Sequence, residues 1–181
     1  MNFIQNIDVS IVLWIQNTLR SDSMTTFWSL ITCLGNGGAF WIVSAVFLLC
    51  FKKTRPVGIT ALVSLMLCNL ATNLILKELF ARPRPFQYTD AVIPLIKNPG
   101  DYSFPSGHTS ASFSCAFIYY RMLPEKYGIP SILLASMIAF SRIYLGVHYP
   151  TDILGGILVA CIGSRAAWQA THTAADADKK E

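Results

Sequence analysis

The sequence predicts an all-α fold, an integral membrane bundle of six transmembrane helices with an N-terminal amphipathic helix in the membrane interface. Of the 181 residues, 53% are hydrophobic and 13% are charged, whereas soluble globular chains carry about 25% charged residues. The mean hydropathy is +0.47, and the apolar residues fall into runs separated by polar or glycine-rich breaks. These observations exclude a disordered chain, a coiled coil and a nucleic-acid-binding arm, and the length leaves room for one domain.

Residues 1–20 alternate apolar and polar side chains at helical spacing, with Phe3, Ile7, Ile11 and Ile15 on one face. This pattern predicts an amphipathic helix that lies in the membrane interface, and an ordinary packing helix is the alternative. We do not expect a secretory signal, because a basic start and a small-residue cleavage site are missing.

Six apolar runs follow, and each is expected to form one helix. The helices are expected at Thr25–Leu34, Ala39–Phe51, Val57–Phe80, Pro105–Met122, Ser131–Tyr144 and Thr151–Gln169. The first two runs are short for a bilayer that needs about 20 residues, and a glycine turn at 35–38 joins them. Residues 81–104 form a polar loop, and Leu123–Pro130 forms a short loop. Residues 1–170 are therefore expected to form a single membrane domain, and 171–181 a polar tail.

The basic residues predict an orientation in the cytoplasmic membrane. Six crossings would place both termini on one side, which would receive nine Lys and Arg residues, Arg20 among them, against five on the other. Positive charge marks cytoplasmic loops, so the 81–104 loop is expected to face the extracytoplasmic side. The net charge of +4 is too small for a nucleic-acid stripe, and the expected partner is the lipid bilayer. The sequence gives no signal of the oligomeric state.

The five cysteines lie inside apolar stretches without a C-x-x-C pair. We therefore expect them to be small buried apolar residues rather than disulfide or zinc ligands.

Three cations are expected to converge near the 81–104 loop. Lys77, Arg84 and Arg142 sit where a charge at the membrane edge is costly, which makes them functional candidates. Arginine matches the oxygens of a tetrahedral anion, and three cations suit the charge of a phosphate. Ser106 and Gly107 lie where the loop enters a helix, and free backbone N–H groups there attract an anion. Together these five residues predict a phosphate-binding site.

Two histidines and one carboxylate provide reactive groups beside this site. Asp152 follows His148 by four residues, so its carboxylate can hold one ring nitrogen and leave the other free to attack. His108 can then protonate the leaving group. Asp90 and Asp101 lie in a loop without metal-ligand spacing, so no metal and no cofactor is expected. Arg82 is expected to face lipid headgroups or to act as an auxiliary.

The order Lys77-x6-Arg84-Pro85, Pro105-Ser106-Gly107-His108 and Ser141-Arg142-x5-His148-x3-Asp152 resembles the type 2 phosphatidic acid phosphatase superfamily. This family comprises integral-membrane lipid phosphatases and shares its site with vanadium haloperoxidases. The resemblance implies that His148 forms a phosphohistidine, supported by Asp152, and that His108 is the general acid. It also implies that no metal takes part and that the phosphate ligands are Lys77, Arg84, Ser106, Gly107 and Arg142.

The expected function is hydrolysis of a lipid phosphate. The compact size resembles bacterial members that act on undecaprenyl diphosphate, phosphatidylglycerophosphate or phosphatidic acid, with the first as the leading expectation. Transfer of the phosphate to another lipid or sugar, haloperoxidase activity and a non-catalytic membrane binding protein are the alternatives. Loop 86–101 is expected to contribute to headgroup choice.

Overall fold

The computed structural model describes the backbone of residues 3–178 and the side chains of residues 3–173, and this part of the chain is helical and contains no strand. The main helices are α1 (Phe3–Leu19), α2 (Asp22–Leu34), α3 (Ala39–Leu49), α4 (Arg55–Leu70), α7 (Gly107–Met122), α8 (Glu125–Tyr144) and α9 (Pro150–Asp178). Four short elements complete the chain: the 3-10 turn η1 (Asn36–Gly38), the π-helical turn η2 (Ala71–Leu76), α5 (Lys77–Phe80) and α6 (Pro85–Tyr88).

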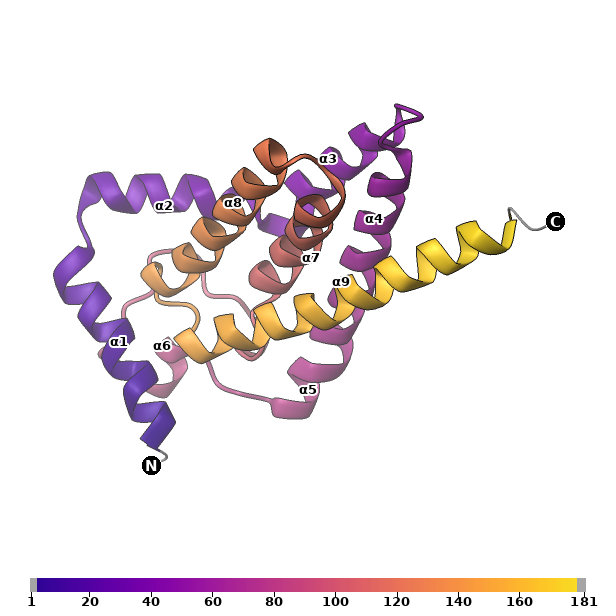
Figure 1. Cartoon of the computed structure of the whole chain (residues 1–181). Coiled ribbons are helices and arrows are strands. Elements are labelled where there is room, and N and C mark those ends of the chain that lie inside the picture. Colours follow the sequence, from indigo (N-terminus) through magenta and orange to yellow (C-terminus); the bar gives the residue numbers. More distant parts are fainter. Residues whose placement is uncertain (1–2, 179–181) are drawn as a thin grey trace.

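Helix α7 forms the centre of the bundle and packs against α4, α8 and α9 (Figure 1). Trp41 of α3 and Phe113, Ile118 and Tyr119 of α7 belong to its apolar core. The buried indole of Trp41 donates a hydrogen bond from Nε1 to Ser112 Oγ at 3.0 Å, so no donor is left unpaired there. The core thus packs α3 against the middle and the end of α7.

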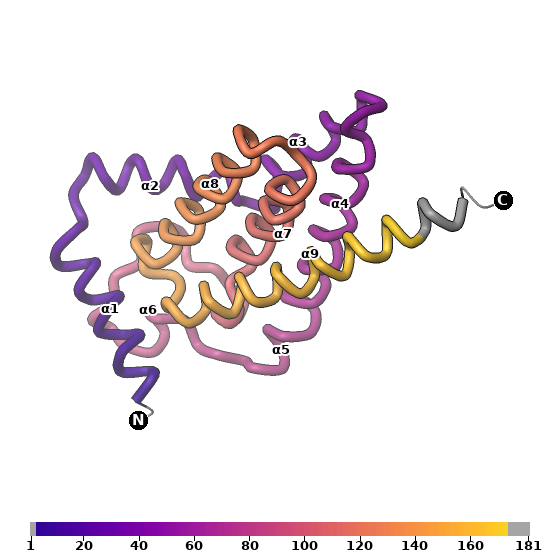
Figure 2. The backbone as a smooth tube through the Cα atoms, in the orientation of Figure 1, coloured from indigo at the N-terminus to yellow at the C-terminus, as the bar shows by residue number. Residues whose placement is uncertain are grey.

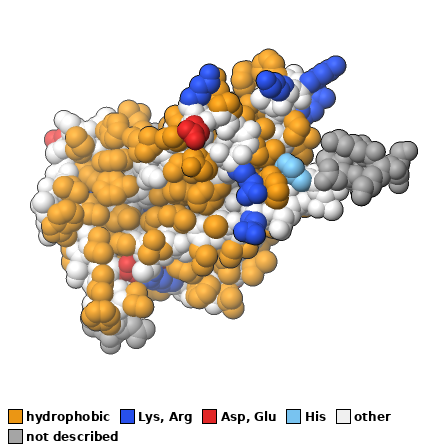
Figure 3. Space-filling model, viewed as in Figure 1, with side chains coloured by type: hydrophobic (Ala, Val, Ile, Leu, Met, Phe, Trp, Pro, Cys, Tyr) orange, Lys and Arg blue, Asp and Glu red, His pale blue; other side chains and the backbone are white. Residues whose placement is uncertain are grey.

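The surface supports a membrane environment. Three helices of the described chain are long and apolar enough to span a bilayer: Arg55–Tyr88, Glu125–Tyr144 and Pro150–Thr173. Asp22–Leu34 and Asn36–Leu49 pass that test only together, as a pair bent by 42°. Orange hydrophobic side chains cover most of the face in Figure 3, as expected for a surface that contacts lipid. The structure therefore confirms an all-helical membrane protein, but it does not confirm six spans.

Helix α1 crosses the end of the bundle where α8 ends and α9 begins (Figures 1 and 2). The side that faces the protein carries the buried residues Asp8, Val12 and Ile15. Asp8 contacts Arg82 and Thr151 there, while Phe3 and Trp14 on the other side are exposed. Apolar residues thus lie on both sides of α1, and the exposed ones on the outer side are compatible with contact to lipid.

Arg20 lies at this same end, which corrects its expected position with the opposite set of basic residues. Its guanidinium donates to the carbonyls of Ile93 at 2.7 Å and Tyr144 at 3.1 Å, and burial lowers the pKa of Arg20. Of the other eight, Lys52, Lys53 and Arg55 lie where α3 meets α4, and Arg121 and Lys126 where α7 meets α8, at the far end of the bundle. Arg165 lies within α9, and Lys179 and Lys180 lie outside the described residues.

Most helix boundaries lie within three residues of the prediction, and two differ by more. Helix α8 begins at Glu125 and contains Pro130, although Pro130 was expected to end a loop. Gly128 allows this early start, because a Cβ there would lie 2.7 Å from Tyr120 Cα of α7. Helix α9 continues to Asp178, beyond the expected end at Gln169, so the tail that was expected from residue 171 is helical to that point.

The cysteines are free, as expected, but only Cys68 and Cys115 are buried. Cys33, Cys50 and Cys161 are exposed. A low-charge stretch in a membrane protein can face lipid as well as the core, so apolar sequence context did not decide burial.

Candidate active site

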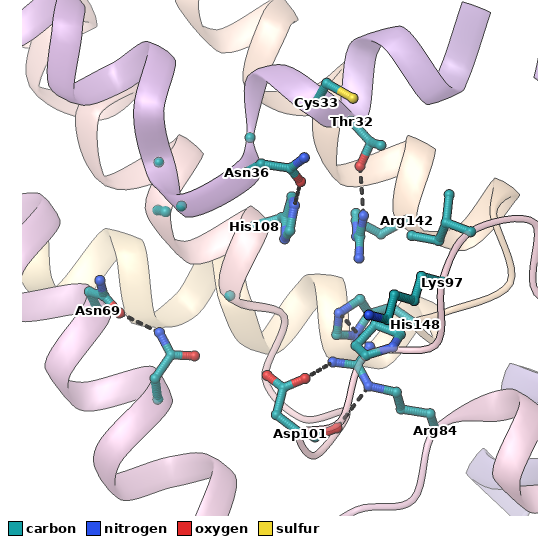
Figure 4. Close-up of a pocket in the computed structure, with 18 of the residues that line it drawn as sticks. Thr32, Cys33, Asn36, Asn69, Arg84, Lys97, Asp101, His108, Arg142 and His148 are labelled. Carbon is teal, nitrogen blue, oxygen red and sulfur yellow. Dashed lines mark hydrogen bonds and ion pairs between the residues drawn. The ribbon is translucent and has the colours of Figure 1, made fainter. Parts of the chain in front are cut away.

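A cavity of about 620 Å³ opens where the ends of several helices meet (Figure 4). One wall comes from α2 and η1, the opposite wall from the loop at 96–101, and the floor from the start of α7, the end of α8 and His148. The predicted residues Lys77, Arg84, Gly107, His108, Arg142 and His148 all line it. Six residues that are up to 71 positions apart in the sequence therefore line the same cavity.

His148 lies in the turn between α8 and α9 and is almost fully buried. Its Nδ1 is 3.2 Å from Asp152 Oδ2, and its Nε2 is 3.2 Å from Arg84 Nη1. Because a carboxylate only accepts, Nδ1 carries the proton and Nε2 keeps its lone pair. Burial lowers the pKa of His148 to about 4, the Asp152 contact opposes this shift and the Arg84 charge adds to it. The ring is therefore a neutral, oriented nucleophile candidate at neutral pH.

A second layer holds Asp152. Its Oδ2 accepts from the Ser103 hydroxyl and from the Tyr149 N–H at 2.9 Å, and its Oδ1 accepts from Arg82 Nη1 at 2.7 Å. Arg82 also pairs with Asp8 of α1 at 2.7 Å and stacks on the Tyr149 ring, with its Cζ 4.0 Å from the centroid. Arg82 was expected to face headgroups or to be an auxiliary, and its contacts are those of an auxiliary that orients Asp152.

Arg84 and Lys77 point at one carboxylate, that of Asp101. Arg84 Nη2 lies 2.6 Å from Asp101 Oδ1, and Lys77 Nζ pairs with Oδ2. Burial alone would raise the pKa of Asp101, but the contacts with Lys77 and Arg84 outweigh it and lower the pKa to about 2. Asp101 was set aside in the sequence because it lacks metal-ligand spacing. In the structure, its oxygens instead occupy the anion position that the cations create.

Arg142, on the last turn of α8, completes the cationic side. Its Nη1 donates to Thr32 Oγ1 at 2.7 Å, and its buried Nε has no hydrogen-bond partner among the described residues. A buried guanidinium N–H without a partner costs free energy unless a ligand supplies an acceptor. Arg142 thus has a donor available for an anion.

Gly107 and Ser106 have different positions at the start of α7. A Cβ on Gly107 would lie 3.7 Å from Lys77 Nζ, which places its backbone beside the cations. Ser106 is the buried N-cap of α7, its Oγ accepts from the Thr109 hydroxyl at 3.0 Å, and it does not line the cavity. The direct contact with phosphate that was predicted for Ser106 therefore stays a prediction, while its capping role is visible.

His108 lies across the cavity from His148. Its Nε2 is 2.9 Å from Asn36 Oδ1 in the η1 turn, as the dashed line in Figure 4 shows. Sequence reasoning did not single out Asn36 or Thr32, because neither belongs to one of the three motifs; the only signal was the unusual Gly35-Asn36-Gly37-Gly38 run.

The site combines a neutral histidine, a second histidine and three cations around one cavity. Among residues 3–173, no three His, Cys, Asp or Glu side chains are grouped so that they could hold a metal ion. The three cations can bind an anion with two or more negative oxygens, His148 can attack the central atom of that anion, and His108 can deliver a proton.

Comparison with known proteins finds relatives that are named as phosphatases of lipid phosphates. The chain is 34% identical over 119 residues to an undecaprenyl-diphosphatase of Sulfolobus acidocaldarius, with 66% of this chain and 57% of the relative aligned. It is 32% identical over 135 residues to a lipid A 4'-phosphatase of Porphyromonas gingivalis, with 67% and 57% aligned. The alignments thus span little more than half of these relatives.

The fold has a solved counterpart. The crystal structure of a transmembrane PAP2-type phosphatidylglycerolphosphate phosphatase from Bacillus subtilis superimposes with a TM-score of 0.78 at 26% identity, and the match covers 96% of this chain and 88% of that one. The model of the PAP2 superfamily matches residues 58–176, which include all three motifs and the helices that carry them. The chain belongs to the PAP2 superfamily.

Proposed function

We propose that this protein is a membrane phosphatase that hydrolyses a lipid phosphate through a phosphohistidine on His148. One observation carries the proposal: His148 Nε2 faces the cations of the cavity while Asp152 holds Nδ1 from behind. This geometry provides both an anion site and an attacking atom at the same point.

The reaction takes two displacements. Nε2 of His148 attacks phosphorus, the bond from phosphorus to the leaving oxygen breaks, and His108 gives that oxygen its proton. In the second step His108, now neutral, takes a proton from water as the water oxygen attacks phosphorus, and the P–N electron pair returns to Nε2. Lys77, Arg84, Arg142 and the backbone at Gly107 would bind the phosphate oxygens in both steps.

Undecaprenyl diphosphate is our leading candidate substrate, followed by phosphatidylglycerophosphate and phosphatidic acid. The relatives' names support this class. A phosphorylated headgroup can enter the cavity at the membrane boundary while its tail stays in the bilayer.

We also propose how the chain sits in the membrane. Helix α1 lies in the interface on the side of the active site, which faces away from the cytoplasm. Of the six apolar segments, α2 and α3 are joined by a 42° bend, so we place them in one broken crossing and revise the expected six crossings to five.

Phosphate release from purified protein in detergent tests the function. Undecaprenyl diphosphate, dioctanoyl phosphatidate and glucose 6-phosphate should be compared, each with and without EDTA. We expect release from the two lipids, little from the sugar phosphate and no effect of EDTA. His148→Ala should remain folded and lose at least about 1000-fold in kcat.

A short reaction with a ³²P-labelled lipid tests the intermediate. The wild-type protein should hold acid-labile, base-stable label that is missing in His148→Ala. Full turnover by His148→Ala, or complete inhibition by EDTA, would overturn the histidine mechanism.

A further inference from the structure

The η1 turn (Asn36–Gly38) is a wall of the active-site cavity that lies outside all three motifs. It interrupts the path from α2 to α3, and Gly35, Asn36, Gly37 and Gly38 all line the cavity. A break in a membrane helix frees backbone groups and is tolerated where it lines a cavity. We therefore expect a contact at the site that explains why the helix breaks here.

The contact is with His108. Its Nε2 lies 2.9 Å from Asn36 Oδ1. An amide oxygen only accepts hydrogen bonds, so Nε2 carries a proton whenever this bond is made. The ring is held in one tautomer, with Nδ1 left as the atom that takes up and gives a proton. Asp152 does the same for His148 from the opposite ring nitrogen.

The glycines around Asn36 fit this contact. A Cβ on Gly35 would lie 2.8 Å from His108 Cδ2, so only glycine lets the ring approach the turn. Gly37 and Gly38 have φ angles of 58° and 68°, a region that other L-residues rarely adopt. Each glycine of the run thus serves either the approach of His108 or the backbone that presents Asn36.

The last turn of α2, just before the glycine run, contacts Arg142, a proposed phosphate ligand. Thr32 Oγ1 accepts from Arg142 Nη1 at 2.7 Å. Thr32 and Asn36 are four positions apart. Asn36 contacts His108, the proposed proton donor, and Thr32 contacts Arg142, a proposed phosphate ligand.

We propose that Asn36 is a positioning residue for His108, and that the glycine turn at 35–38 exists to hold it there. The inference rests on the proposed function, since it concerns the proton that His108 gives to the leaving group. It predicts that loss of Asn36 lowers kcat/KM most for those substrates whose leaving group most needs that proton.

Two substrates separate this role from a structural one. Breaking the P–O bond of dioctanoyl phosphatidate expels dioctanoylglycerol as an alkoxide, which needs a proton, whereas p-nitrophenyl phosphate expels a stabilised p-nitrophenolate, which needs none. For Asn36→Ala, kcat/KM should fall about tenfold or more on phosphatidate beyond any loss on p-nitrophenyl phosphate, since general acids contribute about 10²–10⁴-fold.

Three further variants make the test specific. Gly35→Ala should give the same selective loss, because its φ of −86° suits any residue and the added methyl group meets only His108 and Ile138 side chains closely. Asn36→Asp keeps the acceptor oxygen and should hold the ratio of the two kcat/KM values within about threefold of the wild type. Thr32→Val acts on the phosphate ligand and should lower both kcat/KM values alike.

The outcomes are distinguishable from failure of the function itself. Absence of phosphate release by the wild type would overturn the proposed function. With an active wild type, an equal loss on both substrates for Asn36→Ala and Gly35→Ala would overturn the role of Asn36. If Asn36→Ala does not fold, Gly35→Ala and Asn36→Asp decide the matter by the same ratio.

Discussion

Each of the two site histidines has one ring nitrogen held by an oxygen and the other left for chemistry. For His148 the oxygen belongs to Asp152 and for His108 to Asn36. The carboxylate of Asp152 favours the positive charge that the His148 ring gains during attack, while the amide oxygen of Asn36 fixes which nitrogen of His108 carries the proton. The two histidines thus receive different tasks from their neighbours.

The depressed pKa of His148 predicts a pH effect on stability. A histidine with a pKa of about 4 in the folded protein and about 6.5 unfolded binds its proton first in the unfolded chain. Stability should therefore fall as the pH drops from 6.5 towards 4. Thermal unfolding in detergent should show this fall, and His148→Gln should show a smaller one. Equal slopes in both proteins would contradict the shift.

Asp101 predicts competition with phosphate. Its carboxylate occupies Lys77 and Arg84, yet its side chain is 51% exposed, so it can turn into water when a ligand arrives. Asp101→Asn should therefore bind inorganic phosphate about tenfold more tightly, which is 1.4 kcal/mol, measured as the inhibition constant. Asp90→Asn, an exposed carboxylate of the same loop, is the control. An unchanged or weaker inhibition in Asp101→Asn would show that Asp101 stays with the cations when phosphate binds.

At the scale of elements, Asp8 connects α1 to the proposed catalytic groups. Asp8 pairs with Arg82, which pairs with Asp152, which holds His148. Asp8 lies on the side of α1 that faces the protein, together with the buried Val12 and Ile15, so both an ion pair and apolar packing hold the helix against the bundle.

Asp8→Ala tests this link. Removal of one partner leaves Arg82 less well paired in a mostly buried place, and breaking such a pair costs about 3 kcal/mol. We expect a lower unfolding temperature and a lower kcat, because Asp152 loses part of its support. Asp22→Ala, on the exposed first turn of α2, should change neither. A stable and fully active Asp8→Ala would show that α1 does not support the site.

At the scale of the whole molecule, the active-site cavity lies at one end and a group of exposed basic residues lies at the other, although the exposed Lys97 lines the cavity. The cavity lies at the end where α1 crosses, and exposed basic residues such as Lys53 and Arg121 lie at the other. Figure 3 shows blue side chains gathered towards one end of an apolar face. Moving Arg20 to the site end weakens the charge difference but does not reverse it.

Cysteine labelling in intact cells tests the orientation. In a protein with Cys33, Cys50 and Cys161 replaced by Ala, Asp90→Cys should react with a membrane-impermeant maleimide. Lys53→Cys should react only after the cells are permeabilised. The reverse pattern would place the site on the cytoplasmic side and overturn the proposed orientation.

The sequence by itself determined the helical membrane class and the residues of the three motifs. Hydrophobicity is a property of composition, and the motif residues fix their own spacing along each helix. His148 and Asp152 could be paired from the sequence because they are only four residues apart, and in the structure His148 lies in the turn just before α9, which carries Asp152.

Only the tertiary structure decided which groups meet across segments. Asn36 and His108 are 72 residues apart, Thr32 and Arg142 are 110 apart, and Asp8 and Arg82 are 74 apart. The path of α2 and α3 and the side of Arg20 also depended on packing, because a short apolar run can cross, bend or lie flat with the same composition. The local sequence identifies the motif residues, whereas the packing of the helices decides which partners orient each proposed catalytic group.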